Sequence, residues 1–392
     1  MKNKNIKNKI SVLQVLPHLN SGGLVSGAVE IATALKKQKL NSIVVSSGGY
    51  KENELMRANV TIEKIPADSK NIFTLIENKK RLIKLIKKYN VNIIHARSRA
   101  PAWSSYWAAK ELNLPFVTTF HGTYGLENLL KKKYNSIMLK SNAVIAISNF
   151  IKSHIEEEYK YNKKIHVIPR GVDINIFSPK AVSVARIINT AKQIKMADDD
   201  KIILMPGRLT SWKGHKLALE AVSYIKEKKI KLVIVGDSQN RNKYKKNLIR
   251  LVNTYQIESK VIFIENTRDL PAFLMLSDLV LSCSTKPEAF GRTTLEAQAM
   301  GKPVVAFNHG GSIELVRNNE NGILSEVGNA SELAKNIENC LAYSTSKRKK
   351  IAVTSIENVK KNYLTEYMCK KTINLYKNLI NKFRLNEKNF NN

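Results

Sequence analysis

Two glutamates stand on either side of a glycine in the segment from Pro287 to Glu296. Gly291 interrupts a continuous helix, so we expect Glu288 in a loop and Glu296 about one turn inside the helix that follows. The free N–H groups and partial positive charge at the start of that helix would suit a phosphate. Carboxylates that bind hydroxyls beside an anion site fit a nucleotide sugar, which has a polyol at each end and a diphosphate between. Two glutamates at this spacing are common by chance. The assignment of a nucleotide-sugar site therefore needs support from the surrounding sequence.

The surrounding sequence carries a family resemblance. The segment from Glu288 to Ala306 resembles the Glu-x7-Glu motif of retaining family-4 glycosyltransferases. The resemblance extends from about Ile10 to Tyr343 and implies the GT-B fold and sugar transfer with retained anomeric configuration. Four further segments are similar to the family and occur in its order: Asn20–Leu24, His121–Gly122, Val167–Asp173, and Pro206–Arg208 with Trp212–Gly214.

Two basic residues follow the first predicted strand of the second half of the chain. Arg208 and Lys213 lie five residues apart, at a strand end where side chains would point into a ligand site. A guanidinium makes forked contacts to phosphate oxygens, and an ammonium adds a compact positive charge. Two fixed cations stabilise a departing diphosphate most when its negative charge is largest. In isolation these residues would be solvated surface, whereas the family frame favours a diphosphate clamp.

The first half of the chain offers a glycine loop and two histidines. Gly22 and Gly23 precede a predicted helix, where the backbone can approach a donor phosphate closely. The glycine spacing does not match the dinucleotide-binding pattern, and the next strand does not end in an acidic residue. His121 follows a strand, and the resemblance implies that it contacts the transferred sugar or its phosphate. His18, at the end of the first strand, is a candidate on the acceptor side.

The resemblance also assigns roles around the second glycine turn. It implies that Glu288 binds hydroxyls of the transferred sugar and that Glu296 binds the ribose of the donor. Arg292 departs from the small or apolar residue usual after the motif glycine, and it faces either an acceptor anion or a surface ion pair. We find no carboxylate pair for a double displacement, so a front-face mechanism is favoured. Further donor-binding candidates are Phe290, Gly291, Gly310 and Gly311.

No metal or cofactor is expected. Asp198–Asp200 resembles an Asp-x-Asp metal site, but the run directly precedes a predicted strand, where a solvated turn is the default. The nucleotide sugar is a substrate. The cysteines Cys283, Cys340 and Cys369 are far apart, lack metal-ligand spacing and suggest no disulfide framework, which fits a reducing cytoplasm.

The formal net charge of +33 is the other large feature of the chain. A bias toward Lys, Asn and Ile codons would raise glutamate as well, so it does not explain the imbalance. A basic surface attracts nucleic acid or anionic lipid. Lysines recur at Lys79–Lys88 and Lys131–Lys133, and no nucleic-acid motif is present, so we favour peripheral contact with the inner face of the cytoplasmic membrane. No apolar run is long enough for a membrane span, and Ile10–Leu16 fits a buried strand better than a signal peptide.

Short apolar runs alternate with amphipathic ones, which predicts two doubly wound α/β domains facing a central cleft. We expect domains at 1–178 and 179–359. The resemblance implies that the first is on the acceptor side, that the second binds the donor, and that a helix at 360–392 crosses back onto the first. The polar tail from Arg384 is expected to be disordered. Predicted strands are Ser11–Leu16, Ser42–Ser46, Val91–Ala96, Phe116–Phe120, Val144–Ile147, Ile165–Ile168, Ile202–Met205, Leu232–Val235, Val261–Ile264, Leu279–Ser282 and Val304–Phe307. Predicted helices include Ala28–Lys37, Asn71–Tyr89, Asn149–Glu158, Lys216–Lys228, Gln239–Tyr255 and Thr293–Met300.

The sequence therefore predicts a retaining, metal-independent glycosyltransferase. Its acceptor would be a membrane glycolipid, such as a lipopolysaccharide core precursor, or another glycan. A nucleotide-sugar epimerase of the same fold is the alternative, and it would need acid/base groups around the sugar and no acceptor. A non-enzymatic nucleic-acid-binding protein is a further alternative that rests on charge alone.

Overall fold

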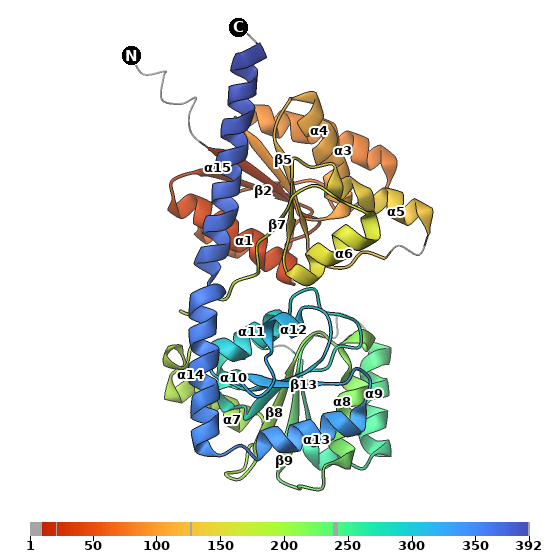
Figure 1. Cartoon of the computed structure of the whole chain (residues 1–392), viewed down its shortest axis with the longest axis vertical. Coiled ribbons are helices and arrows are strands. Elements are labelled where there is room, and N and C mark those ends of the chain that lie inside the picture. The colour runs from red at the N-terminus through yellow and green to blue at the C-terminus, as the bar shows by residue number, and fades with distance from the viewer. Residues whose placement is uncertain are drawn as a thin grey trace. The chain divides into compact units, whose positions relative to one another are not determined.

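The computed structural model describes residues 10–20, 22–125, 128–237, 242–265, 267 and 269–390. The chain forms two compact units. The N-terminal unit comprises Met1–Arg170 and Thr365–Asn392, and the C-terminal unit comprises Gly171–Leu364. Each unit is built on one parallel sheet covered by helices (Figure 1). This is the doubly wound architecture that the alternation of apolar runs predicts.

The sheet of the N-terminal unit has seven strands in the order β3-β2-β1-β4-β5-β6-β7, and all neighbouring pairs are parallel. The central strands are almost fully buried, as expected for strands covered on both faces. The strand order reverses between β1 and β4, which is where ligands bind in open α/β sheets. The strands are β1 (Ser11–Val15), β2 (Asn41–Ser46), β3 (Thr61–Lys64), β4 (Ile93–Ala96), β5 (Phe116–Phe120), β6 (Ala143–Ala146) and β7 (Ile165–Val167).

The helices of this unit include one that comes from the far end of the sequence. Helix α15 (Thr365–Phe390) packs beside α1 and contributes Ile373, Tyr376 and Ile380 to the apolar core beneath the first sheet. Figure 1 shows α15, in dark blue, lying along the same unit as the red α1. The remaining helices are α1 (Gly23–Lys37), α2 (Glu52–Arg57), α3 (Ile72–Lys88), α4 (Arg99–Glu111), α5 (Leu129–Asn135) and α6 (Asn149–Tyr159).

A buried polar network joins α15 to the first sheet. The phenol oxygen of Tyr376 lies 2.5 Å from His95 Nδ1, and His95 Nε2 lies 2.7 Å from Thr119 Oγ1. The fully buried guanidinium of Arg97 donates to the side-chain oxygen of Gln14. Burial lowers the pKa of His95 well below its usual value, so this ring is neutral. Because these groups are buried away from water, losing one of these hydrogen bonds would destabilise the unit.

The sheet of the C-terminal unit has six parallel strands in the order β10-β9-β8-β11-β12-β13. Its order reverses between β8 and β11, so the ends of these two strands are the expected ligand site. The strands are β8 (Lys201–Pro206), β9 (Ile230–Val235), β10 (Val261–Ile264), β11 (Leu279–Ser282), β12 (Val304–Phe307) and β13 (Gly322–Ser325).

Two apolar clusters cover the two faces of the second sheet. One cluster joins the sheet to α8, α9 and α13, and the other joins it to α7, α10 and α11. Helices on both faces explain why the central strands are continuous apolar runs in the sequence. The helices are α7 (Val184–Gln193), α8 (His215–Tyr224), α9 (Asn242–Thr254), α10 (Leu270–Leu276), α11 (Arg292–Ala299), α12 (Ser312–Leu315), α13 (Ala330–Leu341) and α14 (Thr345–Asn362).

Every predicted strand overlaps an observed one, and the errors lie elsewhere. The prediction missed β3 and β13, which are short edge strands. Helix α8 ends at Tyr224 rather than at Lys228, because the backbone at Ile225 is extended and its side chain joins the core. The expected helix from Gln239 begins at Asn242 among the described residues.

The prediction of a disordered tail from Arg384 is wrong as far as Phe390, where α15 ends. Arginine, leucine, glutamate and lysine in this segment are good helix formers, and they extend the packed helix. The crossing helix expected from about Lys360 is two helices in the structure, because Lys360 belongs to α14 and α15 begins at Thr365. The backbone between them pairs elsewhere: Val172 donates to Tyr363 and bridges Leu364.

The Tyr376 hydroxyl gives a test of the buried network. Tyr376→Phe leaves Nδ1 of His95 without a partner, while Nε2 keeps Thr119, and it should lower the free energy of unfolding by about 1–3 kcal/mol. Tyr367→Phe, on an exposed part of the same helix, is the control and should leave stability unchanged. Urea denaturation of the full chain measures both values. Equal stability of the two variants would contradict a structural role for the network.

Candidate active site

The candidate site of the C-terminal unit begins at the end of β8. The loop that follows carries Gly207, Arg208 and Lys213, and it closes at Gly214, where α8 starts. Arg208 is exposed and makes no ion pair with any described carboxylate. The Lys213 ammonium lies over the Trp212 ring at 4.7 Å from its centroid. Both predicted clamp residues therefore lie at the point where the strand order reverses.

Lys213 reaches the loop that follows β11. Its Nζ donates to Glu288 Oε1 at 2.5 Å, and Ser284 Oγ donates to the same oxygen at 2.6 Å. The Lys213 and Glu288 side chains are only 17% and 14% exposed, so the pair is well shielded from water. A shielded ion pair of this kind holds its geometry more firmly than a surface pair does. The structure thus brings Lys213 and Glu288 together in one cluster.

Backbone contacts fix the two loops to each other. Thr285 N donates to the Trp212 carbonyl at 2.7 Å. Gly214 adopts a left-handed φ of 81°, and a Cβ there would lie 1.8 Å from the Cys283 carbonyl oxygen. Only glycine fits this close approach. The position of Lys213, one residue earlier, therefore depends on Gly214.

Helix α11 supplies the second carboxylate. Gly291, with a φ of 97°, precedes the helix, so Glu288 lies in the loop and Glu296 one turn inside, as the glycine predicts. Arg292 Nε donates to Glu296 Oε1 at 3.2 Å, which makes this pair an i,i+4 ion pair. Thr294 is fully buried, and its hydroxyl has no hydrogen-bond partner among the described residues. Arg292 is thus paired with Glu296 inside the unit, and its predicted role on the acceptor side stays a prediction.

The glycine turn after β12 packs against the same loop. Gly311 N donates to the Glu288 carbonyl at 2.6 Å. A Cβ on Gly310 would lie 2.7 Å from that carbonyl, and one on Gly311 would lie 2.5 Å from Phe290 Cα. His309 Nε2 lies 2.7 Å from the Ser284 carbonyl oxygen. Three loops from neighbouring strands are thus held around Glu288.

Two groups near Lys213, the Cys283 thiol and the His215 ring, are neutral. Burial raises the pKa of the Cys283 thiol to about 12, so the thiol stays protonated beside Lys213. Burial, with a smaller contribution from Lys213, lowers the pKa of His215 to about 4. Neither group titrates near neutral pH, and neither offers a second charge for the cluster.

The glycine loop of the N-terminal unit is held by an arginine to which the sequence assigned no role. Arg170 Nη2 donates to the Gly23 carbonyl at 2.6 Å and lies 3.7 Å from Glu30 Oε2. Its guanidinium covers Gly27, where a Cβ would lie 1.8 Å from Nη1. Gly22 has a φ of 117°, and space is open beside both Gly22 and Gly23, because a Cβ on either would meet nothing within 4 Å. The loop can therefore accept a close ligand.

His121 lies at the end of β5. Its Nε2 is buried without a hydrogen-bond partner among the described residues. Burial, with smaller contributions from Arg170 and Arg97, lowers its pKa well below the usual value, so the ring is neutral. His18 is exposed, and its Nδ1 accepts a hydrogen bond of 3.4 Å from Asn20 N. Arg170 and Arg97 are thus close enough to His121 to act on its pKa.

Sequence reasoning missed Ser284, His309 and Arg170 as parts of these clusters. Arg170 stands in the segment Val167–Asp173, which carries the family resemblance and was a signal that could have found it. Ser284 has no such signal, because its role follows from the fold of the β11 loop.

The Asp198–Asp200 run lies in the turn before β8. Asp200 accepts a hydrogen bond from Ala197 N at 2.9 Å, and Asp199 pairs with Lys229. Among the described residues, no three His, Cys, Asp or Glu side chains are grouped to hold a metal ion. The run lies in a turn as expected, and Asp199 is exposed, but the Asp200 side chain is only 7% exposed and is therefore not solvated.

Comparison with sequence families identifies both units. The model of the family "Glycosyltransferase Family 4" matches residues 21–176, and that of "Glycosyl transferases group 1" matches residues 187–357. Together the two matches cover most of the chain. They define the class, which is a sugar transferase with one matched region in each half.

Comparison with solved structures leads to the same class of protein. A glycosyltransferase from Rickettsia africae ESF-5 is 40% identical, covers 95% of this chain and 99% of its own, and superposes with a TM-score of 0.88. The chain therefore belongs to the glycosyltransferases of the GT-B fold. Anabaena HepE in complex with UDP-glucose shares the fold, with 23% identity, a TM-score of 0.84, and coverage of 94% of this chain and 100% of that one. The Escherichia coli UDP-Gal:alpha-D-GlcNAc-diphosphoundecaprenol alpha-1,3-galactosyltransferase is 28% identical over 344 residues, 83% of this chain and 86% of that protein.

Gly214 gives a test of the loop arrangement. Gly214→Ala should destabilise the unit and displace Lys213, because its Cβ would overlap the Cys283 carbonyl. Gly328→Ala is the matched control: this glycine also has a left-handed φ, of 84°, but nothing lies within 4 Å of the added Cβ. The control should cost about 1–2 kcal/mol from backbone strain alone, and Gly214→Ala clearly more. Thermal denaturation and transferase assays compare the two, and equal effects would contradict the close approach.

Proposed function

We propose that this glycosyltransferase moves a sugar from a nucleotide-sugar donor to a hydroxyl of a membrane glycolipid, with retained configuration and without a metal ion. The observation that carries the proposal is the shielded Lys213–Glu288–Ser284 cluster at the switch point of the second sheet. Such a switch point is where open α/β sheets bind nucleotides. The cluster offers a cation for phosphate and a carboxylate for hydroxyls side by side.

The clamp for the diphosphate consists of Arg208, Lys213 and the start of α11. An ammonium has further N–H donors beyond the one that Glu288 accepts, so Lys213 can contact phosphate without leaving Glu288. Arg208 is exposed one residue after Gly207, and a Cβ on Gly207 would lie 3.7 Å from the Lys213 side chain. The buried, unpartnered hydroxyl of Thr294 near the start of α11 adds a polar group at the expected anion site.

The two carboxylates bind the polyols at the two ends of the donor. Glu288 accepts hydrogen bonds from hydroxyls of the transferred sugar, and Glu296 accepts them from the ribose. Arg292 donates to Glu296 and orients it until the ribose arrives. Support for a nucleotide-sugar donor comes from the fold shared with HepE, which was solved with UDP-glucose, and from the galactosyltransferase relative, whose name gives UDP-Gal.

The reaction proceeds on one face of the sugar. The bond from the anomeric carbon to the diphosphate oxygen breaks, and the acceptor hydroxyl oxygen forms its bond from the same side. The acceptor proton passes to the departing diphosphate, whose growing negative charge Arg208 and Lys213 stabilise. His121, held neutral by its buried surroundings, can donate a hydrogen bond to the sugar or its phosphate.

The acceptor is a glycolipid. The galactosyltransferase relative is named for an acceptor that joins GlcNAc to diphosphoundecaprenol, which is a lipid-linked sugar. A lipopolysaccharide core precursor is a second acceptor of the same chemical kind. A strongly basic chain would bind the phosphate groups of either acceptor.

Substitutions in the cluster test the donor site. Glu288→Ala and Arg208→Ala should each lower kcat about a hundredfold, as loss of one stabilising contact to the transition state does. Glu320→Ala and Arg317→Ala remove an exposed carboxylate and guanidinium from the same unit and serve as matched controls. Near-wild-type rates in both folded site variants would overturn the assignment.

A second experiment tests the transfer itself. A thermal-shift screen of nucleotide sugars should identify the donor, because a bound ligand raises the melting temperature by mass action. The donor is then incubated with purified membranes, and nucleoside diphosphate release should depend on the membranes. Isomerised donor without an acceptor would instead indicate an epimerase.

Chelation tests the absence of a metal requirement. Because Arg208 and Lys213 supply the positive charge at the diphosphate, activity should be unchanged after treatment with EDTA and gel filtration. Loss of activity that added Mg²⁺ or Mn²⁺ restores would refute this part of the proposal.

A further inference from the structure

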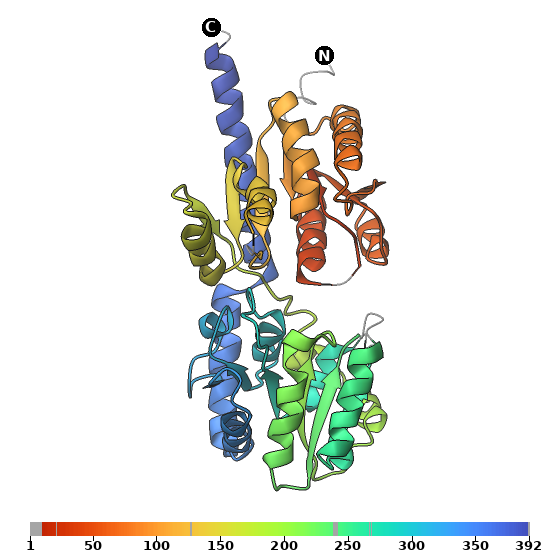
Figure 2. The same ribbon diagram turned by 90° about the vertical axis from the view of Figure 1, so that its right-hand side faces the viewer.

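Large apolar side chains are exposed together on one side of the N-terminal unit. Near the start of α3, Ile72 is 52% exposed, Phe73 79% and Ile76 44%. On α5, Leu129 is 84% exposed and Leu130 79%. Exposing such groups to water is unfavourable, so a cluster of them indicates a surface that is covered in use. Figure 2 shows α3, α4 and α5 on the side that faces the viewer.

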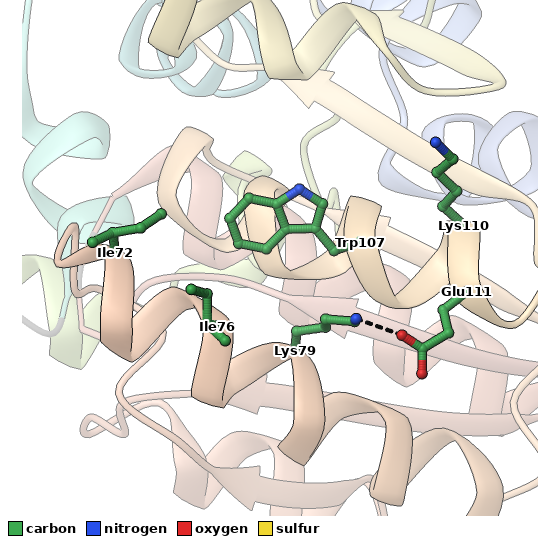
Figure 3. Close-up of a pocket in the computed structure, with 6 residues that line it drawn as sticks. All are labelled: Ile72, Ile76, Lys79, Trp107, Lys110 and Glu111. Carbon is green, nitrogen blue, oxygen red and sulfur yellow. Dashed lines mark ion pairs between the residues drawn. The ribbon is translucent and has the colours of Figure 1, made fainter.

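A groove lies between α3 and α4. It has a volume of about 580 Å³ and is lined by Ile72, Ile76, Lys79, Trp107, Lys110 and Glu111. Figure 3 shows Ile72 and Ile76 on α3 and Trp107 on α4 bordering the same space, with the Lys79–Glu111 ion pair at one end. The groove is thus apolar along its centre and charged at its end.

Aromatic rings connect this groove to α5. The ring centroids of Trp107 and Trp103 are 5.6 Å apart, and those of Trp103 and Tyr134 are 6.3 Å apart. Trp103 Nε1 also donates to the Tyr134 carbonyl at 3.3 Å. Tyr134 lies one turn after Leu130 on α5, so the exposed groups of α3 and α5 are joined through α4. We call Ile72, Phe73, Ile76, Trp107, Leu129 and Leu130 the α3–α5 surface.

Lysines border the α3–α5 surface. Lys131–Lys133 directly follow the two leucines and are exposed, and Lys110 and Lys80 are exposed on α4 and α3. Apolar side chains next to lysines, together with tryptophan and tyrosine, are the composition of surfaces that insert into the interface of an anionic bilayer. Among the described residues, no helix is long and apolar enough to cross a membrane.

We propose that the α3–α5 surface docks the N-terminal unit on an anionic membrane, with the leucines and Phe73 inserted among the acyl chains and the lysines at the headgroups. The inference rests on the proposed function, because it gives the surface that would meet a lipid-linked acceptor. The chain from β5 runs through His121 to Gly125 before α5, and Asn135 Nδ2 on α5 donates to the Gly125 carbonyl at 2.9 Å. Docking of α5 therefore holds the His121 loop next to the membrane surface.

Vesicle sedimentation of the full chain tests the proposal. The protein should bind vesicles of phosphatidylethanolamine and phosphatidylglycerol, bind pure phosphatidylcholine vesicles much more weakly, and lose affinity as salt is added. Leu129→Gln with Leu130→Gln should weaken binding at least about tenfold, since the leucines no longer enter the apolar phase. Replacing Lys131, Lys132 and Lys133 with Gln should weaken it about fivefold per lysine.

Matched controls remove the same groups from the other unit. Val184→Gln with Val353→Gln replaces two exposed apolar side chains, and replacing Lys349, Lys350 and Lys360 with Gln removes three exposed positive charges. Both controls should bind vesicles as the wild type does. If they weaken binding as much as the α3–α5 variants, the binding reflects net charge alone and the proposal is wrong.

Two further outcomes would overturn the docking surface. The first is that the wild-type protein does not bind vesicles. The second is that sedimentation equilibrium shows a dimer that the leucine substitutions dissociate, because the α3–α5 surface would then bind a second copy of the chain. Thermal stabilisation by UDP tests the donor site independently of the docking surface. The α3–α5 variants should still be stabilised by UDP, because their substitutions lie outside the donor site. If the protein binds vesicles but transfers no sugar to lipid acceptors, the docking surface is supported and the proposal of a glycolipid acceptor is wrong.

Discussion

The contact between Lys213 and Glu288 is the constraint on which the candidate site depends. A cation and a carboxylate that are both mostly shielded from water need a fixed geometry and further hydrogen bonds to offset the loss of hydration. Ser284 supplies one such bond, and the carbonyl of Ser284 is itself next to His309. The close approach of Gly214 to Cys283 then fixes the loop that carries the lysine. Each loop is therefore positioned by its neighbours rather than by its own sequence alone.

In the N-terminal unit, the buried charges are two arginines near a histidine. Arg97 and Arg170 are buried cations, and the Glu30 carboxylate lies 3.7 Å from Arg170. Their positive charge reinforces the effect of burial on His121 and keeps its ring neutral. A neutral ring beside buried cations is suited to hydrogen bonding with a substrate and poorly suited to storing a proton. Helix α15 also packs against this region, where its buried Tyr376 lies 2.5 Å from Nδ1 of His95.

The sequence predicts the strands well because parallel strands covered on both faces are continuous apolar runs. It does not reveal β3 and β13, because these edge strands have short apolar runs, and every residue of β3 and half of the residues of β13 are at least partly exposed. In the site, Glu288, Lys213 and the glycine turns could be named from residue types and family resemblance. The contact of Arg170 with the Gly23 carbonyl could not, because it joins residues 147 positions apart and depends on how tightly α1 packs.

The two proposals give the positive charge of this chain two different physical roles. Lys213 is shielded and paired, so in the proposed donor site its charge would act at short range on the diphosphate and be little affected by salt. The lysines of α5 are exposed, so their charge acts on a broad surface and is screened as salt rises. A codon bias toward lysine would add exposed lysines to all helices alike. It would not place apolar residues as exposed as Leu129 and Leu130 immediately before three lysines, and this combination is what distinguishes a docking surface from a merely basic one.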